Sequence, residues 1–223
     1  MSASAKASTP FDDDRAGAIY RTAARMIYEK GFASTSMNEI AEAVDLTKPG
    51  LYYHVKGKKE LLFAIMSFAM DRLDEEVVGP ARLLEDPAER LRMIVRQHAR
   101  LLTRETGALA ILIDEVGGLS AEQREAITRR KREYFDFLRD ALEALRVAGR
   151  LRVPNATSAA FSILGMVMWI ARWFQPGGRL NGEDVADHVT ETALGGVLNP
   201  SDPALTDSPD HQLATESAST EPA

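Results

Sequence analysis

Two helix-start signals in the stretch Ser36–Leu62 constrain the fold more than any other feature of the chain. Glu39 follows Ser36 at the spacing of a capping box, in which each residue satisfies the backbone amide of the other at the start of a short helix. Thr47 is predicted to be a second helix N-cap. Pro49, two residues later, fits this assignment, because first-turn amides have no intrahelical partners and a proline is tolerated there. Asp45 ends the first helix, so only a short turn separates the two. This spacing predicts helix-turn-helix geometry, in which the second helix lies in the major groove of DNA.

The second of these helices carries the residues that we expect to contact DNA. Lys48 is the predicted base contact, because a lysine ammonium donates to the acceptor atoms of guanine. Gly50 costs about 1 kcal/mol of helix propensity relative to alanine, which indicates either a close approach of the DNA backbone or a tolerated defect. Tyr52 has two open interpretations, a phosphate contact or core packing. The predicted interface consists of Lys48, Pro49, Gly50, Tyr52, Tyr53 and His54, with phosphate anchors at Thr35, Lys56 and Lys58.

The run Ala23–Leu62 resembles the N-terminal domain of TetR-family transcriptional regulators. The resemblance rests on short motifs in a fixed order. They are an Ala pair (Ala23-Ala24) before a Gly-aromatic turn (Gly31-Phe32), a Thr before the second helix (Thr35), an Ile-Ala pair (Ile40-Ala41), a Leu-Tyr pair (Leu51-Tyr52), and a Lys (Lys58) before two Leu (Leu61-Leu62). It implies that Lys58 contacts the DNA backbone. The chain departs from the family at Asp45, Val55 and Gly57, where Gly, Phe and Ser or Thr are usual. Aspartate tolerates the left-handed conformation better than most residues, so the first departure is mild.

The distribution of charge reconciles an acidic chain with DNA binding. The formal net charge is −6, whereas affinity for DNA comes chiefly from neutralising phosphates. Between Arg15 and Lys59, eight basic residues stand against four acidic ones, a balance of +4. The chain has no cysteine and therefore no disulfide or thiolate site. With a small, polar N-terminal stretch and no uncharged apolar run of ~18 residues, we expect a cytoplasmic protein without a signal peptide or membrane contact.

Glycine, proline and capping residues divide the remaining chain into helices, and no segment alternates like a strand, so the predicted class is all-α. We expect a disordered tail over 1–13, a helix-turn-helix domain over 14–60, a ligand-binding and dimerisation domain over 61–198, and a disordered acidic tail over 199–223. The first helix should stop at Gly31, and the helix from Lys58 should close at Gly79-Pro80. Further helices are predicted over 87–103, 120–148, 155–174 and 183–198, with a short apolar segment over 109–116.

The helix over 155–174 predicts a homodimer. It is apolar nearly all round, so it must be covered on two sides. One side can face its own domain, but only the final helix over 183–198 remains to cover the other. The economical solution is a twofold dimer in which these two helices and their copies form a four-helix bundle.

A ligand pocket is predicted between the helices over 87–103, 120–148 and 155–174. Its candidate lining residues are His98, Leu102, Tyr134, Phe161, Gly165, Met168, Trp169 and Arg172. A histidine on an apolar face has the competing interpretation of a hydrogen-bonded core residue, which we favour for His98. Arg172 is the stronger candidate, because a charged side chain in an apolar helix requires an anionic partner, either an acid of the dimer or a ligand's phosphates.

The segment Gly165–Val189 resembles the C-terminal region of TetR regulators of fatty-acid or steroid catabolism that acyl-CoA thioesters release from DNA. The shared marks are Trp169, the Arg-Trp-Phe run and a Pro-Gly-Gly turn before Leu180. The resemblance implies an acyl-CoA effector, whose diphosphate would suit Arg172. The predicted function is therefore a transcriptional repressor that binds double-stranded operator DNA as a homodimer, needs no cofactor and is released by a small hydrophobic effector.

Two other classes of function stay open. One is a TetR-type regulator of an efflux pump that responds to hydrophobic drugs, and the other, with less support, is an all-α enzyme. The histidines are scattered, and no Gly-rich phosphate loop follows a strand. Asp184 and His188, four residues apart, are as readily a surface pair as metal ligands. We therefore predict no catalytic residue and no metal site.

Overall fold

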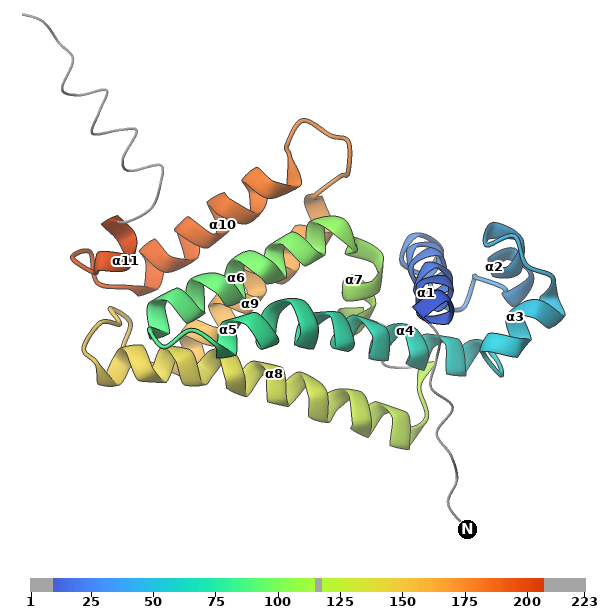
Figure 1. The fold of residues 1–223 in the computed structure, drawn as a ribbon, viewed down its shortest axis with the longest axis horizontal. Helices are drawn as coiled ribbons and strands as arrows, with labels where there is room; N and C mark the ends of the chain where they lie inside the picture. The colour runs from blue at the N-terminus through green and yellow to red at the C-terminus, as the bar shows by residue number, and fades with distance from the viewer. Residues whose placement is uncertain (1–9, 115–117, 207–223) are drawn as a thin grey trace, which may run out of the picture. The chain divides into compact units, whose positions relative to one another are not determined.

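The computed structural model describes residues 10–114 and 118–206. Within this part the chain is helical, with one isolated β-bridge between Leu151 and Leu198 and no strand (Figure 1). The helices are α1 (Pro10–Lys30), α2 (Met37–Ala43), α3 (Lys48–His54), α4 (Lys58–Leu73), the π-helix η1 (Asp74–Val78), α5 (Gly79–Arg82), α6 (Pro87–Arg104), α7 (Thr106–Asp114), α8 (Ala121–Val147), α9 (Ala156–Trp173), α10 (Gly182–Val197) and α11 (Pro203–Thr206). The all-α prediction is confirmed, although α1 begins inside the segment predicted to be a disordered tail.

Most helix ends lie where the capping and glycine signals predict them. Gly31 and Gly149 follow α1 and α8 with φ of +83° and +69°, a conformation that residues with a Cβ rarely adopt. Ser120 and Gln123 exchange hydrogen bonds at the start of α8. Asp86 accepts hydrogen bonds from two first-turn amides of α6. Each of these signals acts within a few residues of chain, so the sequence alone identifies it.

The helix that begins at Lys58 does not close at Gly79-Pro80, so this prediction is wrong. α4 passes into η1, where Gly79 donates its amide to the carbonyl of Asp74, five residues back. Pro80 has no amide hydrogen, and in a regular α-helix its ring would clash with the carbonyl four residues before it. The wider π-helical turn removes this conflict, and the helix continues through α5 to Arg82.

The chain forms two compact units, and their division differs from the predicted boundary at residue 60. The first unit contains the residues up to Arg72 together with Glu105–Lys131, and the second contains Leu73–Arg104 together with the residues from Arg132 onward. In the first unit α7 packs along α1. Gly107 of α7 approaches so closely that a Cβ there would lie 2.9 Å from the backbone nitrogen of Arg25. A segment of the predicted ligand-binding domain therefore belongs to the unit that carries the helix-turn-helix.

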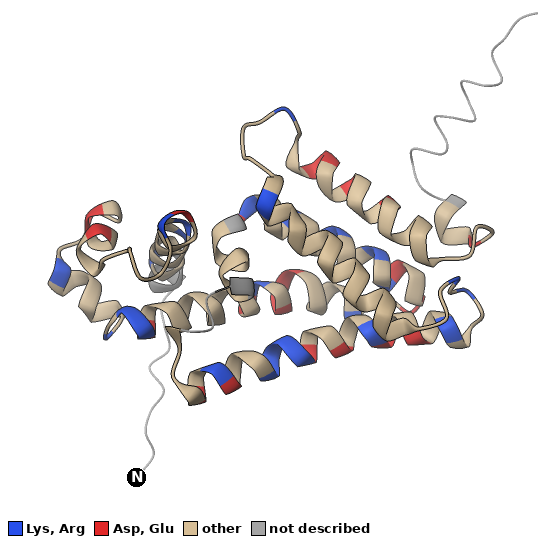
Figure 2. Cartoon of the chain, turned by 180° about the vertical axis from the view of Figure 1, so that it is seen from behind, with Lys and Arg blue, Asp and Glu red and all other residues tan. Residues whose placement is uncertain are grey.

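In the second unit α6 packs against α9 and α10, and a row of ion pairs joins α6 to α10. One face of α6 has an arginine at every fourth residue, and the facing side of α10 has acidic residues at the same spacing. In Figure 2 the arginines are blue and the acidic residues are red. The pairs are Arg92 with Glu191, Arg96 with Asp187 and Arg100 with Glu183. All three pairs fit a single register and rotation of α10 on α6.

α9 has two apolar sides, of which one is buried. Ile163, Val167 and Ile170 lie in the core, whereas Phe161 and Trp169 are exposed. α9 is also the one helix in the described residues that is long and apolar enough to cross a membrane, with 39% of that stretch buried. A single chain therefore leaves the outer side of α9 uncovered.

Candidate nucleic-acid interface and effector region

The turn between α2 and α3 has the geometry that the sequence predicts. Ser36 Oγ accepts the amide of Glu39 at 3.2 Å, and Glu39 Oε2 accepts the amide of Ser36 at 2.8 Å, which completes the capping box. Thr47 Oγ1 accepts the amide of Gly50 at 3.2 Å and so caps α3. Asp45 adopts a φ of +53°, which a short polar side chain tolerates. The substitution of aspartate for the usual turn glycine therefore leaves the turn intact.

α3 buries Leu51 and presents most of its other side chains. Lys48 and Pro49 are exposed, and Tyr53 is exposed by 85%. Tyr52 is exposed by 40%, which favours a contact role over core packing. The outer side of α3 therefore offers one cation and two aromatic rings to a partner.

Gly50 and His54 have local roles in α3. A Cβ at position 50 would lie 3.3 Å from Thr47 Oγ1, the atom that caps the helix. A larger residue would therefore press on the cap, an explanation for Gly50 that does not require DNA. His54 is half-buried at the end of α3, and its ring meets the Tyr53 ring edge to face with 5.5 Å between centroids.

Two of the three predicted phosphate anchors are engaged within the protein. Thr35 is buried, and its hydroxyl donates to a backbone carbonyl four residues back at 3.0 Å. The ammonium of Lys58 donates to the carbonyl of Ala33 at 3.2 Å and lies 4.5 Å from the centroid of the Phe32 ring. Both side chains contact the turn between α1 and α2, and their predicted role as phosphate anchors stays a prediction. Lys56, the third anchor, is exposed.

One exposed lysine is absent from the predicted interface, whereas the predicted capping role of Glu39 is confirmed. Lys59 is exposed at the start of α4, and the run of lysines around it was the available signal. Glu39 forms an ion pair with Lys30 at 3.2 Å. Hydrogen bonds from Ser36, together with Lys30, lower the pKa of Glu39 to about 2. The carboxylate is therefore committed to the capping box.

His98 and Tyr134, two of the predicted ligand residues, meet in the core of the second unit. The Tyr134 hydroxyl lies 2.9 Å from His98 Nδ1, and the rings meet edge to face with 5.4 Å between centroids. Burial lowers the pKa of His98 to about 4 and raises the pKa of Tyr134, so both are neutral near pH 7. Leu102, one turn along α6, is also buried. The pair has the geometry of a hydrogen-bonded core histidine, the alternative favoured from the sequence.

The remaining predicted ligand residues lie on α9, and most face outward. Phe161, Gly165, Trp169 and Arg172 are exposed, and Met168 is half-buried. The Phe161 ring packs on Phe135 of α8 with 4.6 Å between centroids. In one chain the exposed members are open to solvent whereas His98 is buried, and the predicted ligand pocket stays a prediction. Because both sides of α9 are apolar, the helical period could not show which side faces inward.

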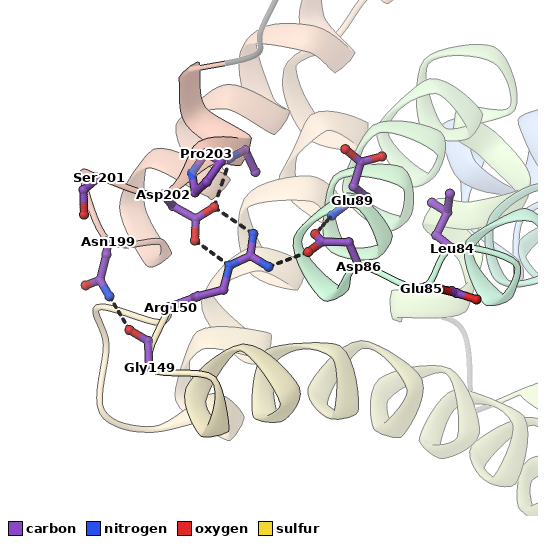
Figure 3. A pocket seen from close by; sticks show the side chains of 11 residues that line it. Leu84, Glu85, Asp86, Glu89, Gly149, Arg150, Asn199, Ser201, Asp202 and Pro203 are labelled. Atoms are coloured by element: carbon purple, nitrogen blue, oxygen red, sulfur yellow. Dashed lines mark hydrogen bonds and ion pairs between the residues drawn. The ribbon is translucent and has the colours of Figure 1, made fainter.

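A cavity of about 650 Å³ lies elsewhere in the second unit, between the start of α6 and the chain that follows α10 (Figure 3). Arg150 donates to Asp202 at 2.8 and 2.9 Å and to Asp86 at 2.5 Å beside this cavity. Asp202 lies in the segment 199–206, for which the sequence predicts disorder, but it is buried here and α11 follows it. The rest of that predicted tail, 207–223, lies outside the described residues. The acidic lining makes this cavity unsuited to an anionic coenzyme.

Two protein-family models match the chain. Residues 19–65 match the bacterial regulatory proteins of the tetR family, and residues 84–197 match the tetracyclin repressor-like C-terminal domain. The second match alone spans about half of the chain. The chain belongs to the TetR family. It is therefore a transcriptional regulator with a helix-turn-helix DNA-binding domain, as the run Ala23–Leu62 predicts, and membership of this family gives no support to the enzyme alternative.

The relatives of this TetR-family chain include two regulators linked to coenzyme A or steroids. One is AibR, whose crystal structure in complex with isovaleryl coenzyme A and operator DNA matches this chain with a TM-score of 0.71. The two sequences are 42% identical, and the match covers 80% of this chain and 97% of AibR. The transcriptional repressor KstR2 of Rhodococcus jostii RHA1 is 27% identical over 86% of this chain and 97% of its own. The ketosteroid regulator KstR2 of Mycobacterium tuberculosis shares the fold, with a TM-score of 0.75. Its sequence is 23% identical, and the match covers 83% of this chain and 95% of that protein.

Proposed function

We propose that the protein is a homodimeric operator-binding repressor whose affinity for DNA is lowered by an acyl-CoA thioester. The observation that carries this proposal is the 42% identity with AibR over nearly the whole of that chain, because the AibR complex holds both isovaleryl coenzyme A and operator DNA. The exposed side of α3 supports the DNA part. The similarity to KstR2, a repressor, favours repression over activation.

The outer side of α9 supports the homodimer. Phe161, Trp169 and Trp173 are exposed there, and an exposed aromatic surface of this kind marks an interface. α10 packs on α9 and exposes Gly195 and Gly196, where a partner helix can approach closely. The ion pairs with α6 keep this side of α10 turned outward. Operator binding by such a dimer requires its two α3 helices to lie about 34–36 Å apart, the spacing of successive major grooves.

The effector part of the proposal assigns different regions to the two ends of an acyl-CoA. Arg172 lies exposed in the last turn of α9, and a guanidinium binds a diphosphate with two parallel hydrogen bonds. We assign the acyl group to an apolar site between α6, α8 and α9, near Leu102. Ligand binding there has to separate the packed helices, which is how it can alter the dimer.

Calorimetric titration with isovaleryl-CoA and a ring-derived acyl-CoA, with and without operator DNA selected from random sequence, tests this mechanism. A ligand that lowers DNA affinity must bind the DNA-free protein more tightly. Reciprocity then requires operator DNA to weaken acyl-CoA binding by the same factor, roughly 5- to 150-fold for a typical coupling. The controls are free coenzyme A, the free acid and a hydrophobic cationic dye.

The outcomes of this titration separate the alternatives. Equal acyl-CoA affinity with and without operator would contradict release, and would indicate the simultaneous binding that the AibR complex contains. Binding of the dye without binding of any acyl-CoA would favour the efflux-pump regulator.

A second prediction concerns base recognition by Lys48. Lys48→Ala should weaken operator binding by roughly 1–3 kcal/mol at the contacted base pair and should relax the preference for that base. Binding to operator, to single-base variants of the operator and to random DNA measures both effects. Lys56→Ala is the matched control and should weaken binding to all sequences alike. Equal losses on operator and random DNA for Lys48→Ala would remove its role as a base contact.

A further inference from the structure

Glu105 is the single residue between α6 and α7, and its carboxylate lies between two other helices. Glu105 Oε1 is 4.0 Å from a guanidinium nitrogen of Arg21 in α1 and 3.8 Å from one of Arg72 in α4. The side chain of Glu105 is 12% exposed, whereas that of Arg21 is 43% exposed. All three residues belong to the first compact unit. One largely buried carboxylate therefore serves two cations that belong to different helices.

The helices α1, α4 and α7 pack around this acid. The guanidinium of Arg21 lies 5.9 Å from the centroid of the Phe68 ring in α4, and the Tyr20 ring packs on the same ring with 5.8 Å between centroids. Two residues after Glu105, Gly107 brings the start of α7 against the backbone of Arg25 in α1. Glu105 therefore lies where α1, α4 and the start of α7 meet.

The placement of α1 affects the placement of the reading helix α3. α2 packs on α1, and Lys30 at the end of α1 forms an ion pair with Glu39 of α2 at 3.2 Å. The hydroxyl of Thr35, just before α2, donates to the carbonyl of Gly31 at 3.0 Å. α3 follows α2 after a short turn. A change in the position of α1 is therefore passed to α3 through α2.

We propose that Glu105 is a positioning residue for the helix-turn-helix, which keeps α1 in place against α4 by pairing with both Arg21 and Arg72. The inference rests on the proposed binding of operator DNA. Without the carboxylate, two like charges on α1 and α4 would lie close together, and their repulsion would favour a different placement of α1. Glu105 falls within the residues matched by the C-terminal family model, so an acid from outside the N-terminal match holds the first helix of the DNA-binding domain.

The direction of the change in operator affinity separates positioning from a simple effect of charge. Affinity for DNA comes chiefly from neutralising phosphates, so charge alone predicts tighter binding when an acid of this unit is removed. Glu105→Gln should instead raise the operator Kd by about 3- to 10-fold. Glu29→Gln, at an exposed acid of α1, is the matched control and should bind operator at least as tightly as the unchanged protein. A Glu105→Gln variant that binds equally or more tightly would overturn the proposal.

Substitutions of Arg21 test whether the acid acts through α1. Arg21→Gln should weaken operator binding less in the Glu105→Gln background than in the unchanged protein, because the interaction is already lost there and the repulsion between the two cations is relieved. Arg21→Lys keeps the charge and should bind operator within about twofold of the unchanged protein. Equal losses from Arg21→Gln in the two backgrounds would show that Arg21 and Glu105 act independently, which contradicts the proposal.

Amide hydrogen exchange of the DNA-free protein tests the same contact without operator. Glu105→Gln should raise the exchange rates of the amides over 17–25 in α1 about threefold or more, whereas Glu29→Gln should not. If Glu105→Gln does not fold, Arg21→Gln replaces it in this measurement, because that side chain is nearly half exposed. Unchanged exchange in α1 would overturn the positioning role. If exchange rises but the unchanged protein does not prefer operator to random DNA, the proposed function fails and the positioning of α1 by Glu105 stands.

Discussion

Trp169→Asp is expected to convert the protein into monomers and to weaken operator binding by a factor of about 100 or more. Two linked helix-turn-helix domains bind one operator more tightly than a single domain does by at least this factor. Trp169 is exposed by 64% on the outer side of α9, so aspartate there removes no core contact. The same substitution would place a desolvated charge in the centre of the proposed four-helix bundle. Sedimentation velocity and operator binding measure the two effects.

Val147→Asp is the matched control for this prediction. Val147 is an apolar residue exposed by 75% at the end of α8, on neither of the helices proposed to form the dimer. The Val147→Asp variant should therefore have the same association state and the same DNA affinity as the unchanged protein. A folded Trp169→Asp variant that sediments as a dimer would show that a different surface forms the homodimer.

Arg150→Met is expected to destabilise the second unit by about 3–5 kcal/mol, the usual effect of removing one partner of a buried ion pair. The side chain of Asp202 is 1% exposed and accepts two hydrogen bonds from Arg150, so the substitution leaves a buried carboxylate without its cation. Urea denaturation at pH 7 measures the change in the free energy of unfolding. Arg146→Met, which breaks an exposed pair with Glu143, is the control and should change stability by less than about 1 kcal/mol.

The pH dependence of stability gives this prediction a second measurement. The hydrogen bond from Arg150 lowers the pKa of Asp202 below its ordinary value of 3.8. A carboxyl whose pKa is lower in the folded state adds stability above the unfolded pKa and loses this contribution as the pH falls toward the folded pKa. The difference between the unchanged protein and Arg150→Met should therefore be constant near neutral pH and shrink below about pH 4. A difference that persists unchanged at pH 3 would contradict the ion-pair explanation.

The features that sequence reasoning predicts correctly are those decided within a few residues of chain. The capping box at Ser36, the N-cap at Thr47 and the glycine at the end of α1 each depend on a neighbour no more than four residues away. Helix periodicity and the absence of strand alternation were likewise sufficient for the all-α class. The family motif added the order of these elements.

The features that were missed depend on partners far away in the chain. Lys58 contacts Phe32 and Ala33, some 25 residues earlier. The order of the segment around Asp202 is decided by Arg150, 52 residues away. Pro80 is a helix-ending signal by local rules, but the π-helical turn η1 accommodates it and the helix continues. A single sequence contains no information about which distant side chain will meet which.

The sequence leaves the placement of the predicted effector residues on α9 ambiguous for a different reason. α9 is apolar on both sides, so its period identifies two equivalent candidate faces. The side chosen for a pocket is largely the side proposed for the homodimer. The contacts of α9 with α6 and α10 show which face belongs to the core of one chain.

The composition of the first compact unit affects how proteins of this kind can diverge. The boundary between the two family matches lies between residues 65 and 84, yet 105–131 belong to the same unit as α1 and α2. An exchange of the N-terminal segment alone would set a foreign α1 against Gly107. The unit that carries the helix-turn-helix is therefore discontinuous in the sequence, because it includes α7 and the start of α8.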